Sequence, residues 1–233
     1  MGCEFYVAPT AHTEKVKLPG MRAGYNLTLL AKNQQGYKNL CKLSSIGYLS
    51  GFYYYPRIDL ELLKEYSEGL ICITGSLGTF LAHEILYGSP EKVAAQIDCY
   101  QKIFQEDYYL DLQRHQMSSE AIKEDGLSHE TWLLQNYEEF MQRQQKLNEN
   151  LIALSQNRSI PLVATNDVHY LEREDWRSHE ILMNIQSGEP CELWEKDSHG
   201  NPKFRVPNPK RQVYASHEYY FKSSEQMETL FAD

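Results

Sequence analysis

The feature that most constrains the fold is the alternation of short β-rich runs with helical runs over the first 170 residues. Runs of aliphatic, β-branched and aromatic residues predict strands at 3–8, 26–32, 69–75, 108–115 and 160–165. Strands that alternate with helices are typical of strand–helix–strand units around a mostly parallel sheet or barrel. The sequence therefore predicts an α/β fold.

Two helices are predicted from apolar residues spaced three and four apart. One begins at Pro90 and continues to Phe104, with proline in the first helical position that this residue favours. A longer one begins at Ser128 and keeps its spacing as far as Leu154 if polar Gln144 takes one of the core-facing positions. We expect this long helix to lie across the outside of the sheet.

The pattern changes after residue 170. We expect a helix, a dense turn, an aromatic strand and a short helix, at 172–186, 197–202, 213–222 and from Ser223. No Pro/Gly/Ser-rich segment is long enough to act as a linker between domains. We therefore expect one domain over 1–170 with a helix and hairpin appendage over 171–233; the family resemblance described below implies that 1–170 forms a partial barrel.

Charge and targeting signals narrow the class of protein. Lys and Arg number 23 against 32 Asp and Glu, a net charge of −9, which argues against a surface that holds nucleic acid by charge alone. No run approaches the ~20 apolar residues of a membrane span, and no secretory signal is visible. Five dispersed cysteines without a CxxC pair indicate reduced thiols. We expect a cytoplasmic protein.

Several common catalytic motifs are absent. There is no GxxxxGK[ST] or GxGxxG, and none of the His-Glu pairs extends to HExxH. The run TGSLG at 74–78 has Thr74 where the nucleophile elbow GxSxG requires glycine. The sequence therefore gives no support to a P-loop, a dinucleotide fold, a zinc protease or a serine hydrolase.

What remains is a set of metal-binding side chains on or after predicted strands. Glu4 lies on the first strand, His115 ends the fourth, and Asp167 and His169 follow the fifth. Sites in α/β barrels and parallel sheets are built at the carboxyl ends of strands. Residues two apart in extended chain project to the same side, so Asp167 and His169 suit one Zn²⁺, Mn²⁺ or Mg²⁺ ion.

Each of these residues also has a purely structural interpretation. Asp167 and His169 fit an exposed loop with an Asp turn cap, His115 fits a hydrogen-bonded core histidine, and Glu4 fits a solvated carboxylate. The residues alone leave both interpretations open.

Longer blocks resemble a known family. They include GCEFYVA at 2–8, LTLLAKN at 27–33, GYKNL at 36–40, VATNDVHY at 163–170, HEIL at 179–182 and IQSG at 185–188. In this order they resemble the polymerase-and-histidinol-phosphatase (PHP) domain of the bacterial DNA polymerase III alpha subunit. The resemblance implies a distorted seven-stranded β/α barrel with up to three metal ions, Zn or Mn, at its mouth. Family members begin with a His-x-His strand and a strand ending in Thr-Asp-His. Neither precedes Gly2, so we expect a barrel truncated by its first two strands.

The resemblance also assigns site residues. Glu4, His115, Asp167 and His169 match family metal ligands, whereas Asn26 stands where metal-binding members have His and Ser76 where they have Cys. Amide and hydroxyl groups are poorer zinc ligands than imidazole and thiolate. The resemblance thus predicts a degenerate metal site that binds Zn or Mn weakly or not at all, with no catalytic residue.

The function implied is that of a structural and interaction module within a replicative DNA-directed DNA polymerase, a nucleotidyltransferase. Such a module packs against the thumb and palm of the same chain, docks a separate proofreading exonuclease, and meets DNA only through the parent polymerase. On this interpretation the fragment alone is inactive. The alternative is a metal-dependent phosphoesterase or 3′–5′ proofreading exonuclease. A third interpretation is a partly folded fragment whose exposed sheet edges lead to dimers.

Overall fold

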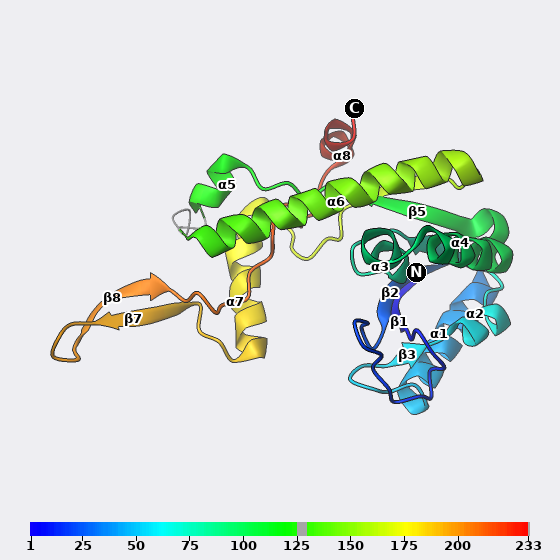
Figure 1. Ribbon diagram of the computed structural model, residues 1–233, viewed down its shortest axis with the longest axis horizontal. Coiled ribbons are helices and arrows are strands. Elements are labelled where there is room, and N and C mark those ends of the chain that lie inside the picture. Colours follow the sequence, from blue (N-terminus) through cyan, green and yellow to red (C-terminus); the bar gives the residue numbers. More distant parts are fainter. Residues whose placement is uncertain (125–129, 233) are drawn as a thin grey trace. The chain divides into compact units, whose positions relative to one another are not determined.

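The computed structural model describes residues 1–124 and 130–232 (Figure 1). The chain forms two compact units. The first comprises Met1–Leu112 and Lys146–Val163, and the second comprises Gln113–Gln145 and Ala164–Asp233. The predicted helix start at Ser128 lies outside the described residues. The expected boundary at residue 170 between a partial barrel and an appendage stays a prediction.

A six-stranded mixed sheet organises the first unit. Its order is β3-β1-β2-β4-β5-β6. β2 runs antiparallel to both β1 and β4, whereas the β1–β3 and β4–β5 pairs are parallel. The strands are β1 (Gly2–Val7), β2 (Tyr25–Ala31), β3 (Arg57–Ile58), β4 (Leu70–Thr74), β5 (Tyr108–Gln113) and β6 (Leu162–Thr165).

The α/β prediction is confirmed, and all five predicted strands are present with ends shifted by two residues or fewer. The two-residue strand β3 was missed because two residues are too few to show a period. The described strands form an open sheet that does not close on itself, consistent with part of a β/α barrel. The sheet also has antiparallel pairs that a simple strand–helix–strand pattern does not predict.

Local capping explains where the helices of this unit begin. The side chains of Asn33, Asp59 and Thr79 accept hydrogen bonds from backbone N–H groups three residues later. The helix predicted from Pro90 to Phe104 is confirmed. The helical elements here are α1 (Gln34–Leu49), α2 (Leu60–Glu65), α3 (Phe80–Tyr87), α4 (Pro90–Phe104) and the 3-10 turn η1 (Gln105–Asp107).

A buried arginine holds the irregular segments of the first unit. Arg57 has no solvent exposure, and its guanidinium donates to four backbone carbonyl oxygens. The distances are 3.1 Å to Gly51, 3.0 Å to Ala23, 3.1 Å to His12 and 2.8 Å to Glu14. Burial lowers the pKa of the Arg57 guanidinium. Two loops far apart in sequence therefore share one cation as their hydrogen-bond donor.

The second unit has a core and elements of its own. Met117, Ala121, Leu133 and Tyr137 pack together as a buried cluster. The elements are α5 (Ser119–Glu124), the first half of α6 (Thr131–Arg158), the 3-10 turn η2 (Arg173–Asp175), α7 (Trp176–Ser187), the hairpin β7 (Glu192–Lys196) and β8 (Pro202–Pro207), and α8 (Ser224–Leu230). The helices predicted over 172–186 and from Ser223 are confirmed. No described helix, the 28-residue α6 included, is long and apolar enough to cross a membrane.

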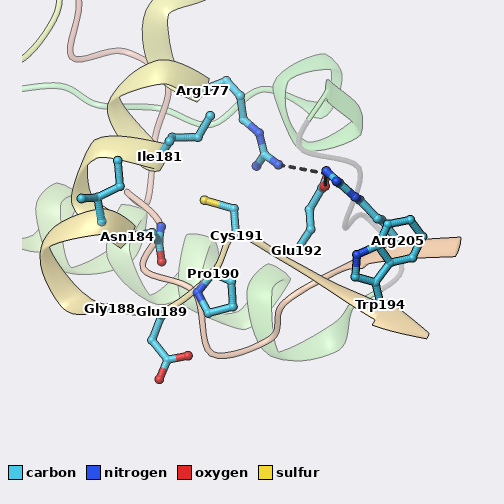
Figure 2. Close-up of a pocket in the computed structure, with 11 residues that line it drawn as sticks. Arg177, Ile181, Asn184, Gly188, Glu189, Pro190, Cys191, Glu192, Trp194 and Arg205 are labelled. Carbon is cyan, nitrogen blue, oxygen red and sulfur yellow. Dashed lines mark hydrogen bonds and ion pairs between the residues drawn. The ribbon is translucent and has the colours of Figure 1, made fainter. Parts of the chain in front are cut away.

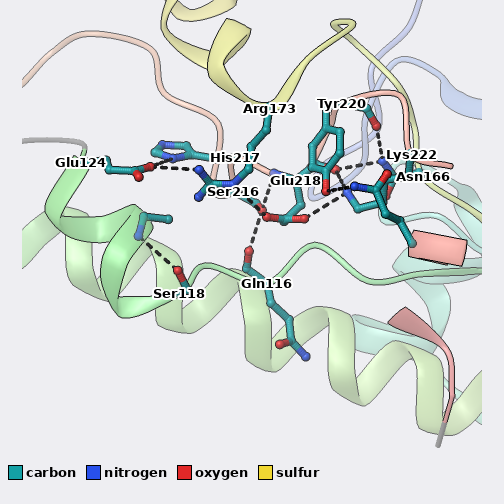
Figure 3. Close-up of polar contacts among 12 residues, drawn as sticks. Gln116, Ser118, Glu124, Asn166, Arg173, Ser216, His217, Glu218, Tyr220 and Lys222 are labelled. Atoms are coloured by element: carbon teal, nitrogen blue, oxygen red, sulfur yellow. Dashed lines mark hydrogen bonds and ion pairs between the residues drawn. The ribbon is translucent and has the colours of Figure 1, made fainter. Parts of the chain in front are cut away.

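The strand predicted at 213–222 is wrong. Only one isolated bridge forms there, between Tyr170 and Tyr220. Two carbonyl groups of the segment accept hydrogen bonds from one side chain (Figure 3). Tyr219 and Phe221 bond to the backbone of the loop at 169–171, with no regular ladder. The amide nitrogen of Asn166 donates to the carbonyl oxygens of Glu218 and Tyr220, at 2.8 Å each. The rings of Tyr214 and Tyr219 contact other rings of the unit, among them that of His169.

A groove of about 670 Å³ lies between α7 and the β7–β8 hairpin (Figure 2). Glu192 pairs with two cations there, at 3.7 Å from Arg177 and 3.4 Å from Arg205. The Arg205 guanidinium also lies 5.1 Å from the centre of the Trp194 ring. Ile181 and Ile185 of α7 supply the apolar wall and remain exposed.

A neutral histidine packs within the second unit. The His217 ring stacks on Trp176 at 3.8 Å, and burial, with the nearby Arg173 cation, lowers the pKa of His217 to about 4. The Glu124 carboxylate lies 4.0 Å away but accepts a hydrogen bond from Arg173 at 3.3 Å. Its charge is thus offset by the arginine, and we expect burial to dominate the pKa of His217.

Arg57→Met should destabilise the first unit by about 3 kcal/mol or more, because four buried carbonyl oxygens lose their donor. Urea unfolding measures this loss. Arg22→Met, at an exposed position, is the matched control and should change stability little. A loss below about 1 kcal/mol for Arg57→Met would contradict this account.

His217 should make the second unit less stable in acid. Between pH 6.5 and about 4 the unfolded imidazole binds a proton that the folded one does not, so stability present above pH 6.5 is lost as the pH falls. At pH 5 the loss amounts to about 2 kcal/mol. Urea unfolding at pH 7.5 and 5 should show a smaller acid loss for His217→Phe. The exposed control His199→Phe should behave as the parent chain does.

Candidate functional site

The first unit brings together two residues that the sequence singled out. Glu4 lies on β1 and Asn26 on β2, and the side-chain amide of Asn26 donates to Glu4 Oε1 at 2.9 Å. An imidazole at position 26 would offer a lone pair to a metal. The amide nitrogen of Asn26 has none to offer and gives its hydrogen to the carboxylate. The contact ties the two strands together through a hydrogen bond between the predicted ligand Glu4 and Asn26.

The loop that carries Ser76 passes beside Asn26. The backbone N–H of Asn26 donates to the carbonyl oxygen of Gly78 at 3.0 Å. A Cβ atom on Gly78 would lie 2.9 Å from Asn26 Cγ, so a larger residue there would displace the Asn26 side chain. The carbonyl oxygen of Ser76 accepts from Thr79 Oγ1 at 2.8 Å, at the start of α3. Positions 26 and 76 therefore belong to one corner of the first unit.

In the second unit, His115 is a buried residue with both ring nitrogens engaged. Gln144 of α6 makes a double contact: its Oε1 accepts from the His115 backbone N–H at 2.6 Å, and its Nε2 lies 3.0 Å from His115 Nδ1. His115 Nε2 lies 3.0 Å from the carbonyl oxygen of Asn166. Since the amide nitrogen can only donate, Nδ1 accepts and Nε2 carries the proton.

The surroundings of His115 also favour the uncharged ring. Burial lowers the pKa of His115, and the ring stacks on Tyr219 at 4.0 Å. This geometry matches the hydrogen-bonded core histidine that the sequence left open, and the ligand role of His115 stays a prediction. Gln144 was not predicted as a site residue. The signal for it was its polar side chain on the apolar face of a helix.

Asp167 and His169 lie in the loop that follows β6. Asp167 has a left-handed backbone (φ 44°), and its Oδ2 lies 3.5 Å from His169 Nε2. The hydrogen bond with His169 lowers the pKa of Asp167. His169 Nε2 also lies 3.3 Å from the hydroxyl of Tyr214. The side chains of Asp167 and His169 are 47% and 32% exposed, so this pair is within reach of solvent.

The structure thus brings four of the predicted site residues together as two separate pairs. It joins Glu4 to Asn26 in the first unit, and Asp167 to His169 in the second. Across 1–124 and 130–232, no three His, Cys, Asp or Glu side chains form a group that could hold a metal ion. Sequence reasoning did not single out Tyr214 or Tyr219, whose rings contact His169.

Comparison with known proteins identifies the class. Residues 1–115 match the family model described as the PHP domain. These residues belong to the PHP-domain family, as the sequence blocks predicted.

Its relatives then specify the branch of that family. Over the whole chain it is 46% identical to the DNA polymerase III subunit alpha of Chlamydia pneumoniae. The proteins of that name from Borreliella burgdorferi and Thermus aquaticus are 36% and 32% identical over the same length. The chain spans only 18%, 17% and 16% of these three relatives. The resemblance to the PHP domain of DNA polymerase III alpha is therefore confirmed.

Gln144→Leu should destabilise the chain by about 2 kcal/mol, because it leaves a buried N–H and a buried ring nitrogen of His115 without partners. Urea unfolding measures the change. Gln142→Leu, exposed on the same helix, is the matched control and should be nearly neutral. Equal stability of the two variants would show that Gln144 does not hold His115.

Proposed function

We propose that this chain is the PHP-domain part of a bacterial replicative DNA polymerase, where it serves DNA replication as a structural and interaction module. Over the whole of this chain, its 46% and 36% sequence identity to two DNA polymerase III alpha subunits supports its place in a replicative polymerase. The double contact between Gln144 and His115 supports the structural role. It engages His115, a predicted metal ligand, in joining helix α6 to the end of strand β5.

The donor set does not fit the family's metal cluster. His115 has no lone pair left for a metal, and the Glu4 carboxylate accepts from an amide that replaces an imidazole. Zinc sites are built from imidazole, thiolate and carboxylate groups, commonly four at a time. Asp167 and His169 are the pair that keeps a ligand-like arrangement. We therefore propose a degenerate site that holds Zn or Mn weakly or not at all.

The partners proposed follow from the family and from charge. The chain would pack against the thumb and palm of the same polymerase chain and would dock a separate proofreading exonuclease. Its net charge of −9 supports contact with DNA only through the rest of the polymerase. On this proposal the fragment catalyses nothing by itself.

The intact Asp167–His169 pair supports a second candidate. A metal-dependent phosphoesterase or 3′–5′ proofreading exonuclease needs a solvent-accessible metal site, and this pair is partly exposed. The two candidates differ in metal content and in activity on a primer end.

The deciding measurement is metal content by plasma mass spectrometry after equilibration with Zn²⁺ or Mn²⁺ and desalting. We expect well under one ion per chain. Asn26→His/Ser76→Cys should raise zinc retention at least several-fold, because it supplies an imidazole beside Glu4 and a thiol in the loop that passes beside position 26.

A near-stoichiometric metal in the parent chain would contradict the module proposal if Asp167→Ala/His169→Ala removed it. Release of nucleotides from a mismatched primer end, lost in the same double variant, would establish the nuclease instead. Light scattering on the same samples checks for dimers, the outcome expected of exposed sheet edges.

A further inference from the structure

The first 57 residues carry a charge opposite to that of the rest of the chain. They hold seven basic and two acidic side chains, a charge of +5, in a chain whose total is −9, so the remainder carries −14. Five of the basic side chains are exposed and take part in no ion pair within the described residues: Lys15, Lys17, Arg22, Lys38 and Lys42. A local charge of this sign attracts an anionic partner.

Large apolar side chains are exposed on the same part of the first unit. Tyr48 and Leu49 end α1, and Phe52 follows it, with exposed fractions of 63%, 87% and 49%. The rings of Tyr48 and Phe52 lie 6.5 Å apart. Lys38, Lys42 and Leu49 recur at spacings of four and seven, so they lie along one line of the helix. Cations and apolar groups therefore alternate along one exposed surface.

Arg57 brings a basic loop to this end of α1. Its guanidinium donates to the carbonyl oxygen of Glu14 at 2.8 Å and to that of Gly51 at 3.1 Å. Lys15 directly follows Glu14, and Phe52 directly follows Gly51 (Figure 1). One buried cation therefore holds the start of the lysine-bearing loop beside the start of the aromatic segment.

Tyr54 is presented to solvent from a strained backbone. Its φ of 64° lies in the left-handed region, which is unusual for a bulky residue. The backbone N–H of Tyr53 donates to the carbonyl oxygen of Tyr55 at 3.1 Å, so Tyr54 forms the tip of a tight turn. Its side chain is 71% exposed and contributes little to the core. Glycine would adopt this backbone without strain, and strained residues gather at binding sites.

We propose that this surface docks an acidic segment of a separate protein that also carries apolar anchors. The docking surface consists of Lys38, Lys42, Tyr48, Leu49, Phe52 and Tyr54. Carboxylates of the partner would pair with the lysines, and its apolar side chains would cover the rings and Leu49. The inference rests on this surface alone and holds whether or not the chain works in a polymerase.

A protein segment fits this surface better than single-stranded nucleic acid does. Leu49, the most exposed of these apolar side chains, offers no ring on which a base could stack. The Tyr48 and Phe52 rings are tilted by 36° to each other, and those of Tyr53 and Tyr54 by 59°, so they form no row of parallel platforms. The net charge of −9 also opposes a polyanion that extends beyond the surface.

The probe is a fluorescein-labelled synthetic peptide of 16 residues, the length of α1, with Glu on one helical face and Leu and Phe on the other. Fluorescence anisotropy follows its titration with the 233-residue chain. The matched probes replace every Leu and Phe with Ser, or every Glu with Gln, and a labelled oligo(dT) represents nucleic acid. We expect saturable binding that weakens as salt rises, and about tenfold weaker binding of each matched probe and of oligo(dT).

Two changes test the charge and the apolar part separately. Lys38→Glu/Lys42→Glu should abolish peptide binding. Lys102→Glu/Lys146→Glu, exposed on α4 and α6, makes the same change in net charge and should leave binding nearly unchanged. Leu49→Ser should weaken binding about tenfold, because it removes an exposed anchor.

Tyr54→Gly separates a binding role from a structural one. It should weaken peptide binding and leave the urea midpoint unchanged or raised, because glycine relieves the strain at φ 64°. A lowered midpoint with unchanged binding would show that the ring serves the fold, and would remove Tyr54 from the docking surface.

The proposal is overturned if the acidic peptide shows no saturable binding, or if the Ser-substituted peptide or oligo(dT) binds as tightly. It is also overturned if the two double variants weaken binding equally, since bulk charge would then suffice. Light scattering on the parent chain and on Leu49→Ser, folded by circular dichroism, tests the remaining occupant. A dimer that only the parent forms would show that a second copy covers this surface instead.

Discussion

The double hydrogen bond between Gln144 and His115 decides how the candidate site of the second unit is built. Gln144 satisfies the backbone N–H that follows β5 and also one ring nitrogen of His115. The other ring nitrogen then donates to the carbonyl oxygen of Asn166, next to Asp167. One side-chain amide therefore sets the tautomer of the histidine and connects a helix, a strand end and a loop. Burial makes each of these bonds costly to leave unmade.

Arg57 plays a comparable part in the first unit, since one buried guanidinium supplies donors to two loops. In both units, polar groups inside the protein hold irregular backbone in place. At the surface, the Asn26 amide makes a similar link between strands by donating to Glu4. Glu4 and His115, two residues predicted as ligands, thus take part in the protein's own hydrogen bonding.

Strands and helices were predictable where the sequence repeats. A single strand such as 26–32 or a single helix such as 90–104 shows its hydrophobic period within one segment. Hydrophobic patterning therefore located these elements. The segment 213–222 shows the limit of that approach. Its aromatic residues favour a strand, but Asn166 bonds to its carbonyl groups, and this long-range contact overrides local propensity.

The sequence by itself determined the α/β class, the family and the residue types at the predicted ligand positions, because these follow from order and chemical identity. It also showed that Asn26 and Ser76 are poor ligands, since that depends only on their functional groups. Only the tertiary structure decided which lone pairs remain for a metal. The bonds of His115 come from residues 29 and 51 positions away, and no local pattern encodes which side chain such a distance brings into contact.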